Sequence, residues 1–156
     1  MTDDWPDKRR EIAYTEARAV IDSQNNTMTD IDDKAMRTVR LNTVLLGLLV
    51  TGLQFAPDMF YTTVLQAAFA LLILSTLCGV ITYNESNLYV GPRGEYIEVL
   101  AEDDFSDSPW EEDLLQTMAG MIAENYDDIR WNSRLLTATQ ATLVLGIIGA
   151  VTAVAI

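Results

Sequence analysis

The chain has 156 residues, which suits one domain, and its 23 acidic and 10 basic residues give a net charge of −13. Such a surface repels the phosphates of DNA and RNA, and no basic stripe offsets it, so we expect no nucleic-acid partner. The chain lacks histidine and has a single cysteine inside an apolar segment, which argues against an enzyme. We therefore predict no catalytic, metal or cofactor-binding residues.

Residues 1–40 are polar, and residues 7–40 carry the apolar seam of a long amphipathic helix. The seam positions recur at alternating spacings of three and four residues, which is a heptad-like pattern. They are Tyr14, Ala17, Ile21, Gln24, Met28, Ile31, Ala35 and Thr38. The seam is weakened by two polar members, and Asn25-Asn26-Thr27 is a point where the helix could break. An unbroken helix would run directly into the apolar segment that follows.

Three uncharged apolar segments have the composition of membrane-spanning helices. They are Leu41–Pro57, Met59–Asn84 and Leu135–Ile156. A helix needs about 20 apolar residues to cross a bilayer, and the second and third segments exceed that length. The first segment is shorter, so a buried helix of a soluble protein is its alternative. It reaches the required length if Arg37 and Arg40 lay their stems along the acyl chains.

The link Ala56-Pro57-Asp58 is very short, so residues 41–84 are predicted to form an antiparallel transmembrane hairpin. Residues 85–108 follow as a linker. Within it, Gly91-Pro92-Arg93-Gly94 is a turn signal and lacks the lysine and glycine spacing of a phosphate-binding loop. The segment Tyr96–Leu100 fits either a short helix or a strand.

Residues 109–134 are predicted to form a second amphipathic helix with a clear start. Ser108 is the candidate N-cap, Pro109 suits the first helical position, and Glu111 completes a capping box. The apolar stripe of this helix consists of Trp110, Leu114, Met118, Met121, Ile122, Tyr126 and Ile129. No helix breaker precedes residues 135–156, so we expect the helix to continue into the third apolar segment.

The 10 basic residues all lie in residues 1–40 and 85–134. Because basic loops stay cytoplasmic, both regions and the N-terminus are predicted inside the cell and the C-terminus outside. Basic collars at the points where the amphipathic helices enter the bilayer consist of Arg37, Arg40, Arg130 and Arg134. The sequence thus predicts an all-α integral protein of the cell membrane. Its three transmembrane helices include two that continue long cytoplasmic amphipathic helices.

The predicted spans contain no ionisable side chain, which argues against an ion-coupled transporter. Their polar residues include several threonines together with Asn42, Gln54, Gln66 and Gln140. Asn42 and Gln140 lie at similar depth, so either they hydrogen-bond each other or each faces the headgroup region.

Small residues four positions apart predict close helix packing in the spans. In the third span they are Ala138, Thr142, Gly146, Gly149, Ala150 and Ala153. Candidate complements in the first two spans are Gly47, Ser75 and Gly79. These residues are predicted to pack helices either within one chain or between copies of it.

The layout of the chain also carries a resemblance. An amphipathic helix leads through Ile31-Asp32-Asp33-Lys34-Ala35-Met36-Arg37 into a span with Leu46-Gly47, and a soluble helix with Ala123-Glu124-Asn125 precedes the third span. This layout resembles uncharacterised haloarchaeal three-span membrane proteins and is distantly similar to the transmembrane effectors of Pycsar antiphage systems. The resemblance implies an oligomeric effector that breaches the membrane on a nucleotide signal, and it carries over no ligand residues. The acid-rich, lysine-poor composition separately points to a halophilic archaeon, whose salt screens the charge.

The sequence therefore favours a small membrane protein that self-associates and presents a cytoplasmic helical stalk, which binds a partner protein or transmits a signal. The alternative is a pore-forming defence effector gated through that stalk. A third hypothesis is an accessory subunit of a larger membrane complex. The expected partners are the lipid bilayer, further copies of the chain and a cytoplasmic protein.

Overall fold

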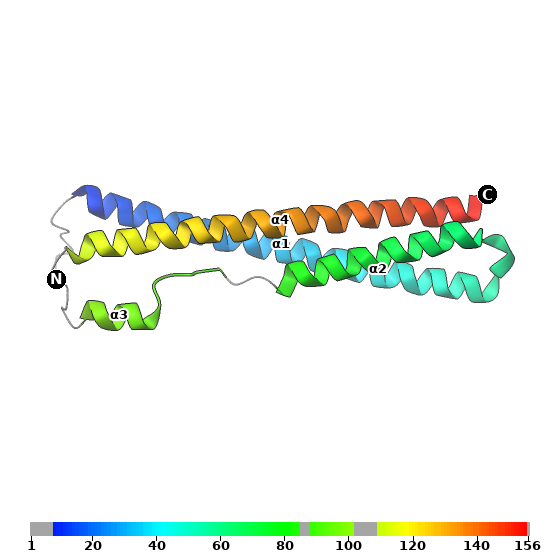
Figure 1. Cartoon of the computed structure of the whole chain (residues 1–156), viewed down its shortest axis with the longest axis horizontal. Helices are drawn as coiled ribbons and strands as arrows, with labels where there is room; N and C mark the ends of the chain where they lie inside the picture. Colours follow the sequence, from blue (N-terminus) through cyan, green and yellow to red (C-terminus); the bar gives the residue numbers. More distant parts are fainter. Residues whose placement is uncertain (1–7, 85–87, 102–108, 156) are drawn as a thin grey trace. The chain divides into compact units, whose positions relative to one another are not determined.

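The computed structural model describes residues 8–84, 88–101 and 109–155, which form helices and no strands (Figure 1). The helices are α1 (Lys8–Phe55), the 3-10 helix η1 (Pro57–Met59), α2 (Thr62–Asn84), α3 (Gly94–Ala101) and α4 (Trp110–Ala155). The predicted all-helical class is confirmed, and 3 helices, α1, α2 and α4, are long and apolar enough to cross a membrane. The proposed N-cap Ser108 lies outside the described residues.

Helix α1 is continuous through Asn25-Asn26-Thr27, so the helix does not break at this point. The Thr27 hydroxyl donates a hydrogen bond to the Ser23 carbonyl one turn earlier, so this side chain is satisfied within the helix. Each predicted seam position from Tyr14 to Thr38 is buried or half-buried. The heptad-like pattern therefore identified the packed face of α1.

The described residues separate into two compact units, whereas the chain length suggested one domain. Those within Met1–Met28 and Asn87–Arg130 form the polar unit, and those within Thr29–Ser86 and Trp131–Ile156 form the span unit. Helices α1 and α4 each contribute one part to each unit.

In the span unit, α2 runs antiparallel to its α1 and α4 segments, and η1 makes the tight turn between α1 and α2 (Figure 1). The expected turn at Ala56-Pro57-Asp58 is present, but α2 begins at Thr62 rather than at Met59. Pro57 starts η1, and Phe60 after it is extended. The Tyr61 amide then donates to the Ala153 carbonyl of α4 at 2.8 Å, which ties the turn to the end of that helix.

Small residues bring the three helices of the span unit together. The buried residues of α2 recur every three or four positions, and they are Leu65, Ala68, Leu72, Ser75, Gly79 and Thr82. A Cβ at Gly146 would lie 2.8 Å from Leu72 Cδ2, and one at Gly79 would lie 2.7 Å from Val39 Cγ2. These contacts need a hydrogen in place of a side chain, so both glycines pack helices within one chain.

The polar unit has a small apolar core formed by Ile21, Leu114 and Met118. Tyr14, Ala17, Tyr96 and Ile122 pack against this core. Tyr96 belongs to α3, so the segment that fitted a helix or a strand is helical.

The predicted stripe of α4 is wrong at two positions. Trp110 is 42% exposed and Tyr126 is 61% exposed, whereas their neighbours Glu111 and Asn125 are buried. Both errors have one cause. The prediction puts aromatic side chains on the packed face, whereas that face carries the carboxylate of Glu111 and the amide of Asn125, which have partners there.

Candidate functional site

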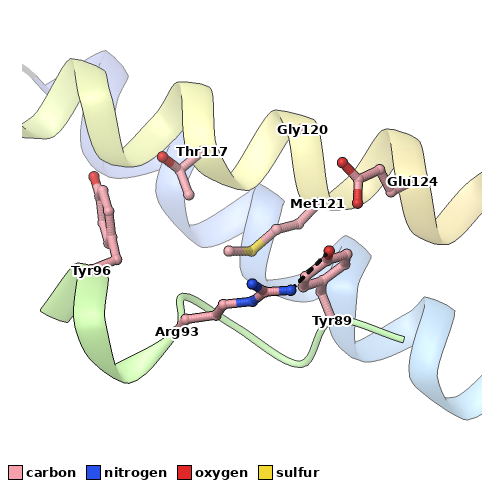
Figure 2. Close-up of a pocket in the computed structure, with 7 residues that line it drawn as sticks. All are labelled: Tyr89, Arg93, Tyr96, Thr117, Gly120, Met121 and Glu124. Carbon is pink, nitrogen blue, oxygen red and sulfur yellow. Dashed lines mark hydrogen bonds between the residues drawn. The ribbon is translucent and has the colours of Figure 1, made fainter. Parts of the chain in front are cut away.

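A cavity of about 280 Å³ opens in the polar unit between α4 and the segment that leads into α3. Its lining residues are Tyr89, Arg93, Tyr96, Thr117, Gly120, Met121 and Glu124. Figure 2 shows Thr117, Met121 and Glu124 on the α4 wall and Arg93 on the facing wall, with Tyr96 and Tyr89 at opposite ends. Charged, aromatic and hydroxyl groups therefore converge on one small space.

Asn125 fixes the segment that carries Tyr89. The Tyr89 amide donates to Asn125 Oδ1 at 2.8 Å, and Asn125 Nδ2 donates to the Tyr89 carbonyl at 2.9 Å. The same Nδ2 also reaches Gln24 Oε1 of α1 at 3.3 Å, and Gln24 Nε2 donates to the Ile122 carbonyl at 2.9 Å. Asn125 is fully buried, so one amide side chain replaces the backbone partners that this non-helical segment lacks.

Arg93 lies against the ring of Tyr89. Its guanidinium carbon is 5.5 Å from the ring centroid, within the range of a cation–π contact, and Nη2 donates to the Tyr89 hydroxyl at 3.3 Å. Neither contact neutralises the guanidinium, because neither involves a carboxylate. Arg93 thus brings a positive charge to the pocket of an otherwise acidic chain.

Tyr96 joins α3 to α4 at the other end of the pocket. Its hydroxyl donates to Asp113 Oδ2 at 2.6 Å. Burial and this hydrogen bond to a carboxylate raise the pKa of Tyr96 to about 12, so the phenol stays protonated and keeps donating at neutral pH. The ring is therefore held in place.

Arg10 joins α1 to the start of α4 in the same unit. Its guanidinium lies 3.8 Å from Glu111 Oε2 and 3.7 Å from Glu112 Oε2. Glu111 is buried, and a carboxylate in the first turn also complements the positive end of the helix dipole. This pairing explains why a charged residue occupies a packed position of α4.

A second polar cluster connects all three helices of the span unit. Asn42 Nδ2 of α1 donates to Ser75 Oγ of α2 at 2.8 Å, and Ser75 Oγ donates to the Thr139 carbonyl of α4 at 2.7 Å. The pairing of Asn42 with Gln140, one of two alternatives from the sequence, is wrong. Gln140 is exposed, and Ser75 is the partner of Asn42.

The remaining predicted residues do not form one site. Arg37 pairs with Asp33 one turn away at 3.8 Å, and it is exposed together with Arg40, Arg130 and Arg134. Gln54 and Gln66 are exposed like Gln140. Of the small residues, Gly146, Gly149, Gly79 and Ser75 pack closely and Ala153 is buried, whereas Thr142 and Ala150 are half-buried and Gly47 and Ala138 are exposed.

Sequence reasoning did not identify the pocket. The sequence pattern places Arg93 in a turn and indicates no role for Thr117 or Asn125. The available signal was the spacing of α4, since Asn125 follows Met121 by four and Met118 by seven on the packed face. Among the described residues, no group of His, Cys, Asp and Glu is arranged to hold a metal ion.

Comparisons with protein-family models, curated proteins and solved structures found no match to this chain.

Proposed function

We propose that this protein is an integral membrane protein that receives a signal on its polar unit and passes it to its membrane spans through α1 and α4. The membrane assignment is supported by the 3 candidate spans. The one-sided basic residues support a cytoplasmic polar unit and an outside C-terminus. In this topology Arg37, Arg40, Arg130 and Arg134 lie where the chain enters the bilayer.

One observation carries the proposal of signal transmission: the helix that lines the pocket is also the helix that packs the spans. Four pocket residues, Thr117, Gly120, Met121 and Glu124, belong to α4. Further along α4, the Thr139 carbonyl accepts from Ser75, and Gly146 and Gly149 lie against α2. A ligand or partner that shifts α4 at the pocket therefore acts on contacts inside the spans.

The proposal includes self-association because glutamine side chains are exposed on the helices of the span unit. Exposed span threonines such as Thr43 and Thr51 satisfy their hydroxyls on the carbonyl four residues earlier. Gln54, Gln66 and Gln140 are exposed, and their side chains make no such bond among the described residues. An amide without a partner is unfavourable in lipid, and amides of neighbouring copies can pair.

The same glutamines favour a second candidate function, a membrane-breaching assembly. If copies associate through these faces, the amides supply polar groups to the interior of the assembly. Dye-filled liposomes separate the two functions. Release of dye by the reconstituted chain supports the assembly that breaches the membrane, and tight liposomes support signal transmission alone.

Signal transmission can be tested by distance measurements in lipid nanodiscs. Spin labels would be placed at exposed Thr43 on α1 and exposed Thr137 on α4, in a Cys78→Ala background. The substitution Asn125→Leu, which releases the Tyr89 segment in the polar unit, is expected to change the distance between the labels. Glu98→Gln on the exposed face of α3 is the matched control. An unchanged distance, with helicity retained by circular dichroism, would show that the polar unit does not act on the spans.

A further inference from the structure

We propose that the pocket of the polar unit binds a small zwitterion, with Arg93 holding its carboxylate and Glu124 its ammonium group. The inference rests on the proposed function, because it names the chemical class of the signal that the polar unit receives. It concerns only the polar unit, and every residue that carries it belongs to that unit.

The size of the cavity sets the scale of the ligand. Pockets for drug-sized ligands usually hold about 300–1,000 Å³, and this cavity of about 280 Å³ falls just below that range. Along α4 it extends from Thr117 to Glu124, which is roughly 10 Å of helix at 1.5 Å per residue. A molecule of the size of an amino acid fits these dimensions.

The two charged residues of the pocket determine which charges a ligand should carry. Arg93 and Glu124 are both exposed and line the same cavity, and neither makes an ion pair within the described part of the chain. A simple anion would be repelled by Glu124 and by an acidic chain of net charge −13. A simple cation would be attracted by that net charge but repelled by Arg93 at the cavity. A molecule that carries both charges can pair with both residues, so each repulsion is offset by an attraction.

The other lining residues fit the body of such a molecule. Figure 2 shows the rings of Tyr89 and Tyr96 and the Met121 side chain bordering the space beside Arg93, and Gly120 adds no side chain. Tyr96 is fixed by its hydrogen bond to Asp113, and Tyr89 is fixed by the backbone bonds to Asn125. The pocket is therefore pre-formed, which lowers the entropic cost of binding. Its apolar groups suit a zwitterion that has an aliphatic side chain or an aliphatic chain between its two charged groups.

The test is titration calorimetry on the full chain in nanodiscs with two zwitterions, L-leucine and 4-aminobutyrate, whose charges are adjacent and separated respectively. Leucinamide lacks the carboxylate and N-acetylleucine lacks the ammonium group, so they serve as matched single-charge ligands. At least one zwitterion is expected to bind. If leucine binds, leucinamide and N-acetylleucine should each bind at least about 10-fold more weakly than leucine. The reason is that a hydrogen bond to a charged group contributes about a factor of 10 or more in affinity.

Variants assign the two contacts. Arg93→Gln should weaken zwitterion binding by about 10-fold or more. It should not weaken the binding of leucinamide, whose positive charge Arg93 repels. Glu124→Gln should weaken zwitterion binding to a similar degree, and it should not weaken the binding of N-acetylleucine, whose negative charge Glu124 repels. Arg134→Gln and Glu98→Gln, outside the pocket, are the controls and should not change the Kd. The proposal is overturned if neither zwitterion binds, if a single-charge relative binds as tightly, or if the controls weaken binding as much as the pocket variants.

Failure of this inference and failure of the proposed function are distinguishable. If no zwitterion binds but Asn125→Leu changes the distance between the span labels, the polar unit transmits a signal from a different ligand. If a zwitterion binds and its saturation leaves the distance unchanged, the pocket is a binding site that does not act on the spans.

Discussion

The polar unit and the span unit use side-chain amides in different ways. In the polar unit, Asn125 and Gln24 bond mainly to backbone groups of neighbouring segments, around an apolar core formed by Ile21, Leu114 and Met118. In the span unit, the amide of Asn42 bonds to a serine hydroxyl, and glycines bring the helices into contact.

The difference follows from the surroundings that we propose for each unit. In water, burial of apolar groups stabilises a fold by about 25 cal/mol per Å², so a small core can hold short segments whose backbone groups are satisfied by amides. Between membrane helices that gain is absent, and close packing of small residues with a few hydrogen bonds takes its place. The two units should therefore respond to different substitutions.

The largest effect is expected from Gly146→Leu in the span unit. A Cβ at this position lies within 3 Å of two Leu72 side-chain atoms and 3.4 Å from the Leu72 amide nitrogen, so α2 and α4 must move apart. We expect a loss of about 3 kcal/mol in the free energy of unfolding, at the upper end for overpacking, measured by denaturation in mixed micelles. Gly47→Leu is the control, because a Cβ there meets nothing within 4 Å. Equal stability of the two variants would contradict this packing.

A smaller loss is expected from Asn125→Leu in the polar unit. The substitution keeps a similar size but leaves the Tyr89 amide and carbonyl without their partner, which costs about 2 kcal/mol. Hydrogen exchange at the Tyr89 amide should accelerate, while exchange in α2 stays slow. Tyr126→Leu on the exposed neighbouring position should leave both rates unchanged. A Tyr89 amide that remains protected would show that Asn125 does not fix this segment.

The spacing of residues predicted the helices and the packed face of α1, because a 3.6-residue period is recorded in the sequence itself. It did not predict the partner of Asn42. Ser75 is distant in the chain, and its hydroxyl reaches Asn42 only because Ser75 and Gly79 lie on the packed face of α2. The pocket escaped prediction for a similar reason, since Arg93 and Glu124 belong to separate segments that Asn125 brings together. Local patterns indicate faces, whereas pairs depend on how segments dock.

A still smaller effect is expected from Asn42→Leu. Hydrogen bonds between membrane helices contribute about 0.6 kcal/mol on average. Asn42 Oδ1 is also buried without a partner among the described residues, so its removal offsets part of the loss. We therefore expect a loss of about 0.6 kcal/mol at most in the free energy of unfolding. Gln140→Leu should leave this free energy unchanged and instead reduce self-association, measured by analytical ultracentrifugation in detergent. A monomer destabilised by Gln140→Leu would contradict its exposed position.

The last effect appears only at high pH and concerns the polar unit alone. The pKa of Tyr96 is raised from 10.0 to about 12, so the protonated phenol is favoured in the folded state. Its contribution to stability is therefore fully present below pH 10 and is lost as the pH rises toward 12. Titration of phenolate absorbance on the folded chain should show a late step from Tyr96. Tyr96→Phe should remove that step and flatten the dependence of polar-unit melting on pH between 10 and 12. Tyr126→Phe, on the exposed face of α4, should leave the late step in place. If the late step survives Tyr96→Phe, then the Asp113 contact does not hold α3 against α4.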